Sequence, residues 1–224
     1  MAFDAETPST WRSLFINALT LMKDMRAHTQ ADAIWTFGGG TVLMLRHRHR
    51  LSKDIDLFVP NPQYLGFVNP RLSDVAAAIS DNYVEAMEYV KLILPDGEID
   101  IVSAHNLTSQ PWTLETIMGE QVRVETDVEI VAKKMWHRGH QATARDLFDL
   151  TLVIKTDAVA VAREAKWLVR HRELFLQQIK KRRDVLQTTF EAIARLPSPR
   201  ILVPAVRSWL LLEARQGRFL DQCL

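Results

Sequence analysis

The spacing of apolar residues changes near residue 125, from a mixture of strand and helix patterns to helix patterns alone. Residues 11–28 carry apolar side chains at three- and four-residue steps, which predicts an amphipathic helix. Short apolar or alternating runs predict strands at 34–37, 54–59, 83–94 (one or two strands), 98–102 and 121–124. Because the turn signal at 95–97 separates two of these runs, we expect them to pair as a hairpin.

Helical spacing accounts for most of the remaining chain. Short helices are expected at 41–48 and 72–80, and a short helix with a loop at 108–119. Beyond residue 125, helices are expected at 127–138, 143–155, 159–195 and 201–216. We therefore predict an α+β protein, with a mixed sheet and flanking helices in residues 1–125 and a helical bundle in residues 126–224.

A glycine turn stands just before two closely spaced aspartates. Gly38 to Gly40 are followed by Thr41. Ser52 comes eleven residues after Thr41, and Asp54 and Asp56 follow it closely. On a strand, residues i and i+2 share a face, so both carboxylates would point the same way. Two adjacent carboxylates repel each other unless a cation lies between them, and Mg²⁺ bound to a nucleotide fits that need. The simpler alternative is a polar turn beside an edge strand.

Asp100 is the third candidate carboxylate. It lies between two isoleucines in the strand expected at 98–102, so its side chain leaves the apolar face. If this strand lies beside the strand at 54–59, Asp54, Asp56 and Asp100 converge and can hold two Mg²⁺ ions that clamp a phosphoryl displacement. The alternative is a solvated carboxylate on an edge strand.

Several residues near the glycine turn are candidates for binding the nucleotide. Backbone N–H groups of Gly39 and Gly40, with the helix that follows, would form an anion site. Thr41 and Ser52 would contact phosphate, or instead cap the helix and end the loop. One arginine of the run at 46–50, assigned to Arg50, would neutralise the leaving group.

A second cluster follows residue 125. Lys133 and Lys134 lie in one expected helix, and Asp146 and Asp149 share a face of the next. A lysine here would hold phosphate, and a carboxylate would orient or deprotonate the attacking hydroxyl. The alternative is a surface ion pair between Arg145 and Asp149.

Charge and composition limit the classes of protein. Residues 1–154 hold 14 Lys and Arg against 20 Asp and Glu, a balance of −6, and residues 155–224 hold 14 against 7, a balance of +7. A basic segment can attract RNA or another polyanion, or form a solvated helix face. The chain has one cysteine, Cys223, no signal-peptide pattern and no apolar run of membrane-spanning length, so we expect a cytoplasmic protein.

Three segments together resemble the AbiEii-like nucleotidyltransferases, toxins of bacterial abortive-infection and toxin–antitoxin systems. They read FGGGTVLMLRHRHRLSKDIDLF, GEIDIV and EIVAKKMWHRGHQATARDLFDL, within residues 37–150. The resemblance implies a polymerase-β-like nucleotidyltransferase core in 1–125, a helical domain in 126–224 that completes the active site, magnesium, and a nucleoside triphosphate donor. It also implies a cognate antitoxin and, more loosely, the acceptor end of transfer RNA as substrate. We therefore expect a toxin that transfers a nucleoside monophosphate to an RNA end or to a protein hydroxyl.

The functional residues of the family carry over to positions that match its motifs. They are Ser52, Asp54, either Lys133 or Lys134, and either Asp146 or Asp149. We favour Lys134 and Asp146 because of their spacing from the preceding alanine and arginine.

Two other functions remain open from the sequence. The chain could transfer nucleotides to a small molecule of the antibiotic kind, although polycationic acceptors favour an acidic cleft rather than a basic half. It could also be a non-catalytic nucleotide- or partner-binding module, for which loss of one carboxylate would be expected.

Overall fold

A computed structural model describes residues 10–29, 34–141 and 143–194. The chain forms two compact units. The first comprises Met1–His47, Ser52–Asn106 and Gln110–Thr126, and the second comprises Arg48–Leu51, Leu107–Ser109 and Asp127–Leu224. Two short segments, 48–51 and 107–109, therefore belong to the second unit although they interrupt the sequence of the first. The two units are described separately.

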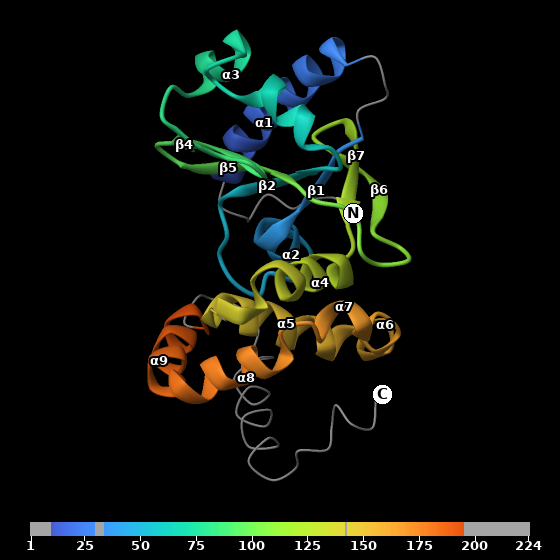
Figure 1. Cartoon of the computed structure of the whole chain (residues 1–224), viewed down its shortest axis with the longest axis vertical. Helices are drawn as coiled ribbons and strands as arrows, with labels where there is room; N and C mark the ends of the chain where they lie inside the picture. Colours follow the sequence, from blue (N-terminus) through green and yellow to red (C-terminus); the bar gives the residue numbers. More distant parts are fainter. Residues whose placement is uncertain (1–9, 30–33, 142, 195–224) are drawn as a thin grey trace. The chain divides into compact units, whose positions relative to one another are not determined.

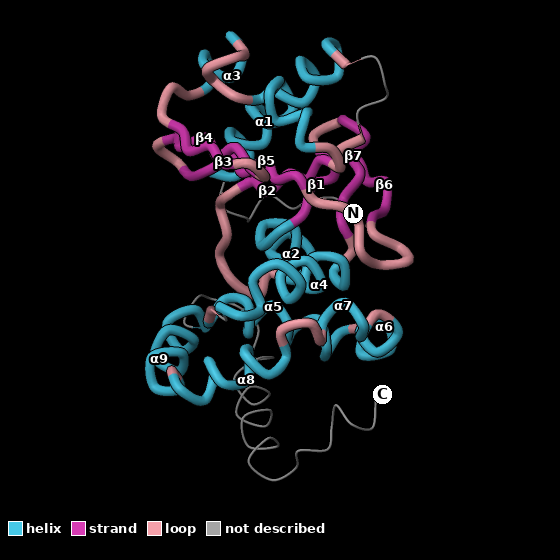
Figure 2. Tube along the Cα trace, viewed as in Figure 1, coloured by secondary structure: helices cyan, strands magenta, loops and turns pink. Residues whose placement is uncertain are grey.

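The first unit is built on a seven-stranded mixed sheet with the strand order β3-β4-β5-β2-β1-β7-β6 (Figure 2). β2 pairs with β5, and β1 with β7, in parallel, whereas the other neighbouring strands pair antiparallel. The strands are β1 Thr36–Gly38, β2 Ile55–Val59, β3 Tyr83–Ala86, β4 Tyr89–Leu94, β5 Gly97–Ser103, β6 Trp112–Ile117 and β7 Glu120–Glu125. The predicted hairpin across residues 95–97 is confirmed as the β4–β5 pair.

Helices cover both faces of this sheet. The helix α1 (Thr10–His28) buries one apolar stripe, which includes Leu14, Phe15 and Met22, as its three- and four-residue spacing predicts. α1 and α3 (Asp74–Ile79) lie over one face, and α2 (Gly39–His47) lies on the other (Figure 1). The proline-containing segment before α3 includes a 3₁₀ helix, η1 (Pro62–Val68).

The central strand β2 alternates between buried and half-buried residues. Ile55, Leu57 and Val59 are fully buried, whereas Asp56 and Phe58 between them are partly accessible. This alternation is the predicted one, and it places Asp56 on the face opposite the apolar residues.

One segment of the sheet was predicted wrongly. Residues 108–119 were expected to form a short helix and a loop, but Trp112–Ile117 form strand β6. β6 is an edge strand of the sheet, and β7 lies between β6 and β1. β6 has polar or half-exposed residues at most positions because it pairs on one side only, and this weakens its periodic signal.

The second unit consists of helices in its described part (Figure 1). They are α4 Asp127–Arg138, η2 Gly139–Gln141, α5 Ala144–Thr156, α6 Ala158–Arg163, α7 Ala165–Leu168, α8 Arg172–Lys181 and α9 Arg183–Ala194. The segment 159–195, expected as one long stretch, is therefore broken into four helices. The helix expected at 201–216, like Cys223, lies outside the described residues.

Local signals set the ends of these helices. Thr143 and Asp146 form a capping box at the start of α5, and the Asp157 side chain accepts a hydrogen bond from the Ala160 N–H at the start of α6. Phe148 and Leu152 of α5 pack with Phe190 of α9 in a small core. Within the described residues, no helix has the length and apolar character required to cross a membrane.

Candidate functional site

Four neighbouring strands of the first unit place a glycine and three charged residues in one row across the sheet. Gly38 on β1 is the register partner of Asp56 on β2, Asp56 that of Asp100 on β5, and Asp100 that of Lys91 on β4. Register partners on adjacent strands place their side chains on the same face. The predicted meeting of the Asp56 and Asp100 strands is therefore confirmed, and the structure adds a lysine beside them.

Asp100 is a strongly perturbed titratable group of this row. Its Oδ1 atom is buried and makes no hydrogen bond, although the Lys91 ammonium lies 3.5 Å away. Burial, and next the negative charge of Asp56, raise the pKa of Asp100 to about 7. Burial alone would lower the pKa of Lys91, but its hydrogen bond to Glu98 and the charge of Asp100 outweigh burial and raise it. A buried carboxylate oxygen with no hydrogen bond is a suitable ligand for a cation.

The raised pKa of Asp100 predicts a characteristic dependence of stability on pH. The native protein keeps this proton up to about pH 7, whereas the unfolded chain releases it near the ordinary carboxyl value of 3.8. Because the native state then binds more protons, this group makes the free energy of unfolding fall as pH rises between these values. Asp100→Asn removes the contribution, so the stability of the variant relative to wild type should increase from pH 4.5 to pH 7, as measured by urea unfolding in EDTA at about these two values. Parallel curves for the two proteins would contradict the assignment.

Gly39 brings the start of helix α2 close to the Asp56 carboxylate. Gly39 has a φ of +73°, and a Cβ atom placed there would lie 1.9 Å from Asp56 Oδ2. Only glycine combines this backbone conformation with this close approach. The Asp56 carboxylate thus lies beside the first residue of α2.

Gly39→Ala should destabilise the protein more than Gly119→Ala does. Both glycines have a positive φ, but a Cβ at Gly119 would meet no atom within 4 Å. Gly119→Ala then reports backbone strain alone, about 1–2 kcal/mol. Gly39→Ala adds the collision with Asp56, about 1–3 kcal/mol more in the free energy of unfolding. Equal losses from the two variants in urea unfolding would show that the close approach at Gly39 is absent.

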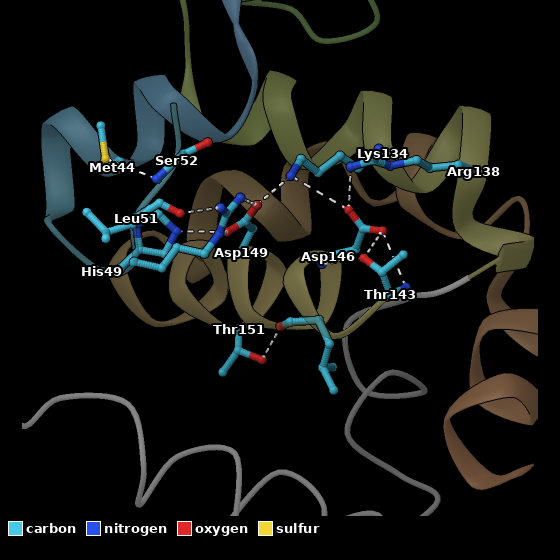
Figure 3. Close-up of polar contacts among 12 residues, drawn as sticks. Met44, His49, Leu51, Ser52, Lys134, Arg138, Thr143, Asp146, Asp149 and Thr151 are labelled. Atoms are coloured by element: carbon cyan, nitrogen blue, oxygen red, sulfur yellow. Dashed lines mark hydrogen bonds and ion pairs between the residues drawn. The ribbon is translucent and has the colours of Figure 1, made fainter. Parts of the chain in front are cut away.

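The other candidates in the first unit lie close to this row. Asp54 precedes β2, and its Oδ1 atom accepts a hydrogen bond from the Glu98 N–H at 3.2 Å. The buried Thr41 hydroxyl donates to the Asp54 carbonyl at 2.6 Å, so it fixes the loop before β2 rather than capping α2, which begins at Gly39. The Ser52 N–H donates to Met44 Sδ at 3.1 Å (Figure 3). The roles predicted for Asp54, Thr41 and Ser52 at phosphate or metal, like that of the buried Gly40, stay predictions.

A second cluster, within the second unit, is centred on the fully buried Asp149 (Figure 3). Arg50 donates to it with Nε to Oδ1 and NH2 to Oδ2, each at 2.8 Å, and His49 Nε2 lies 2.7 Å from Oδ1. The Lys134 ammonium also donates to Oδ2. Burial alone would raise the pKa of Asp149, but the charge of Lys134 and the hydrogen bonds from Arg50 and His49 hold it well below the usual range.

Asp146 and Lys133 have different surroundings. Asp146 accepts from Arg138 at 2.6 Å and from the Thr143 hydroxyl at 2.7 Å, and lies 3.6 Å from the Lys134 ammonium. Lys133 is buried 3.6 Å from Glu129. Lys134 therefore lies between Asp146 and Asp149. Its contact with nucleotide stays a prediction, as does that of Lys133.

The alternative of a surface pair between Arg145 and Asp149 is wrong. Asp149 is fully buried among three other basic side chains, whereas Arg145 is exposed. Arg50, expected at the leaving group, forms a forked pair with Asp149 in the second unit. The predicted role of Arg50 at the triphosphate stays a prediction.

Sequence reasoning missed two residues of these clusters. Lys91 stands on a strand that alternates buried and half-buried residues, and a lysine there looks like an ordinary solvated position. His49 lies 100 positions before its partner Asp149. The run of basic residues from Arg46 to Arg50 was the available signal for His49, because such a run can include residues that pair with a buried anion elsewhere in the chain.

The residues present fit magnesium that arrives with a nucleotide. No group of three or more His, Cys, Asp or Glu side chains among the described residues forms a metal site by itself. Mg²⁺ commonly uses one or two carboxylates and takes its other ligands from phosphates and water. Asp56 and Asp100, with the unbonded Oδ1 of Asp100, supply such a pair.

The mixed sheet, the glycine turn against Asp56 and the parallel strand with Asp100 define a nucleotidyltransferase fold, followed by helices. A family model described as the nucleotidyl transferase AbiEii toxin of Type IV toxin–antitoxin systems matches residues 20–219. The chain belongs to this family, which confirms the predicted resemblance and makes the protein a nucleotidyltransferase toxin by class.

Solved structures to which the chain shows similarity are distant in sequence. JHP933 from Helicobacter pylori is 16% identical, with 94% of this chain and 100% of that chain covered and a TM-score of 0.38. ANT(2″)-Ia in complex with adenylyl-2″-tobramycin is 14% identical, with 80% and 98% covered and a TM-score of 0.39. An antigenic nucleotidyltransferase-like protein from Paracoccidioides brasiliensis is 15% identical, with 79% and 92% covered and a TM-score of 0.42. No curated protein matches the sequence significantly.

Proposed function

We propose that this protein transfers a nucleoside monophosphate from a nucleoside triphosphate to a hydroxyl group of RNA, with magnesium as cofactor. The acceptor oxygen bonds to the α-phosphorus, the bond from the α-phosphorus to the oxygen bridging to the β-phosphorus breaks, and pyrophosphate leaves with release of the hydroxyl proton. The observation that supports this reaction most is the Asp56–Asp100 pair with its unbonded, buried Oδ1. Membership of the family supplies the class of reaction.

Residues of the first unit would bind magnesium and the phosphates of the nucleotide. Asp56 and Asp100 would hold magnesium, which supplies neutralisation of phosphate charge and activation of the attacking oxygen. Asp54, through its bond to the Glu98 N–H, would fix the edge of β5 beside that pair. The N–H groups at the start of α2 would bind phosphate oxygens next to Asp56. Whether one ion or two is held is decided by titration of the metal.

RNA is favoured as acceptor because of charge. Residues 155–224 carry a balance of +7, with 14 Lys and Arg against 7 Asp and Glu. Basic surfaces bind the RNA backbone by releasing its condensed counterions. A small polycationic acceptor gains nothing from such a segment.

The proposal is tested by supplying ATP, CTP, GTP and UTP, each labelled at the α-phosphate, with magnesium, total bacterial RNA and total protein. Label in an RNA band, absent in EDTA and in Asp54→Ala, is the expected result and identifies the donor. Transfer-RNA size of that band would support the acceptor end as the site. Label confined to protein, or to an added aminoglycoside, would contradict RNA as the acceptor.

We also propose a cognate antitoxin, because the family is one of Type IV toxin–antitoxin systems. Expression of the chain should arrest bacterial growth, and co-expression of the neighbouring reading frame should relieve the arrest. Arrest that persists in Asp56→Asn would separate toxicity from nucleotide transfer and contradict the proposal.

A further inference from the structure

Two tryptophans of the second unit lie against each other, and each has a cation over its ring. Trp136 of α4 and Trp167 of α7 meet edge to face with ring centroids 5.3 Å apart. Arg170 Cζ lies 4.4 Å from the Trp136 centroid, and Lys166 Nζ lies 4.9 Å from that of Trp167. Both cations are exposed and both rings are half-buried. These four residues form what we term the aromatic–basic surface, where α4 and α7 pack together (Figure 1).

Two histidines extend the aromatic groups beyond these four residues. His140 and His171 stand next to the two helices in sequence, and their rings meet with centroids 5.1 Å apart. The approach is close because Gly139 has no side chain, since a Cβ there would lie 3.1 Å from His171 Cβ. The aromatic groups are thus held by packing in the unliganded protein.

The chain segment that carries Lys166 and Arg170 is strongly basic. Residues 158–183 contain eight Lys and Arg and two Asp and Glu, a balance of +6. One of the two acids, Glu164, is buried and accepts hydrogen bonds from the N–H and the hydroxyl of Ser109 at 3.0 and 2.5 Å. Hydrogen bonds from Ser109 lower the pKa of Glu164, so it remains ionised but turned away from solvent. Cations therefore outnumber accessible acids in this segment.

A similar aromatic pair elsewhere lacks this charge. Arg123 Cζ lies 5.2 Å from the Trp112 centroid on the β6–β7 hairpin. Residues 112–125 contain one Arg and three Glu, a balance of −2. A cation over a ring is common in proteins and by itself selects no ligand. The location of Lys166 and Arg170 in a basic segment distinguishes the Trp136–Trp167 surface from this hairpin.

We propose that the aromatic–basic surface binds single-stranded RNA, an inference that rests on the proposed function in taking RNA as the acceptor. Unpaired bases stack on tryptophan rings and on guanidinium planes, and the same cations pair with phosphates. Trp136 and Arg170 would stack on the bases, and Lys166 and Arg170 would pair with the phosphates of the backbone. An acidic protein partner would use the cations but leave the rings without a function, so RNA fits the whole set of side chains.

The test measures RNA binding in the Asp56→Asn background, where transfer is removed. A fluorescein-labelled single-stranded RNA of about 12 nucleotides, a length within the range of known single-strand sites, is titrated by fluorescence polarisation. Trp136→Leu should weaken binding about tenfold, the loss expected for one stacked base. Arg170→Gln should lower the slope of log affinity against log salt by about 0.7, the value for one phosphate contact. Trp112→Leu is the matched control and should bind as the background does.

Heparin separates stacking from charge. Arg170→Gln should weaken heparin and RNA alike, whereas Trp136→Leu should weaken RNA alone. The inference is overturned by RNA binding within about twofold of the background in Trp136→Leu, by equal loss of heparin binding in that variant, or by a polyglutamate peptide that competes as well as RNA does. Arg170→Gln, at an exposed position, keeps the test valid if Trp136→Leu unfolds.

Failure of this inference and failure of the proposed function give different results. If RNA binding depends on Trp136 but no label is transferred to RNA, the RNA-binding surface is supported and RNA as the acceptor is overturned. If label is transferred to RNA but the variants of Trp136 and Arg170 bind RNA as the background does, the proposed function is supported and the RNA-binding surface is overturned.

Discussion

Asp56→Asn should lower the rate of nucleotide transfer on the order of a thousandfold or more while leaving the fold intact. Asn keeps the size of the side chain but removes the charge that would hold magnesium beside Asp100. Asp56 lies on the partly accessible face of β2, between buried residues that carry the packing. The loss should therefore appear in kcat, with an unchanged circular dichroism spectrum and urea midpoint.

A matched control distinguishes this effect from a general loss of negative charge. Asp96 is an exposed carboxylate in the turn between β4 and β5, so Asp96→Asn makes the same chemical change in the same unit. Its rate should stay within about twofold of wild type, as expected for a surface substitution away from the site. Retained transfer in Asp56→Asn, measured with α-labelled nucleotide, would refute the assignment of Asp56.

Asp149→Asn should cause the largest loss of stability in the second unit. Asp149 is fully buried, and Arg50, His49 and Lys134 donate to or contact its carboxylate. The amide leaves these cations without the charge that offsets their burial, which costs about 3–5 kcal/mol when one partner of a buried pair is removed. The measurement is the free energy of unfolding in urea.

Arg145→Ala is the control for Asp149→Asn, because it changes an exposed residue of the same helix. Its effect should be within about 0.5 kcal/mol. Stability in Asp149→Asn equal to that of Arg145→Ala would show that the buried cluster is not formed. Reduced transfer in a stable Lys134→Met variant would in turn support the predicted role of Lys134 at the nucleotide.

The alternation of apolar residues made the centre of the sheet predictable. Ile55 and Leu57 point to the core, so the face of Asp56 follows from a two-residue period. Ile99 and Ile101 do the same for Asp100. The pairing of these two strands was a hypothesis, since parallel neighbours far apart in sequence leave no local signal.

Features that depend on distant partners were not predictable. Lys91 is recognisable only once the register of β4 against β5 is known. The burial of Asp149 depends on His49 and Arg50, about a hundred positions earlier, so its spacing on α5 resembled a surface pair. Edge strand β6 carries too few buried residues to show a period.

The most direct test of the central claim is anomalous scattering from Mn²⁺ in crystals grown with a non-hydrolysable nucleoside triphosphate. We expect a manganese peak within about 2.3 Å of carboxylate oxygens of both Asp56 and Asp100, with the triphosphate completing the coordination. Manganese bound elsewhere, while Asp100 keeps its contact with Lys91, would contradict the claim that this row of residues is the catalytic centre.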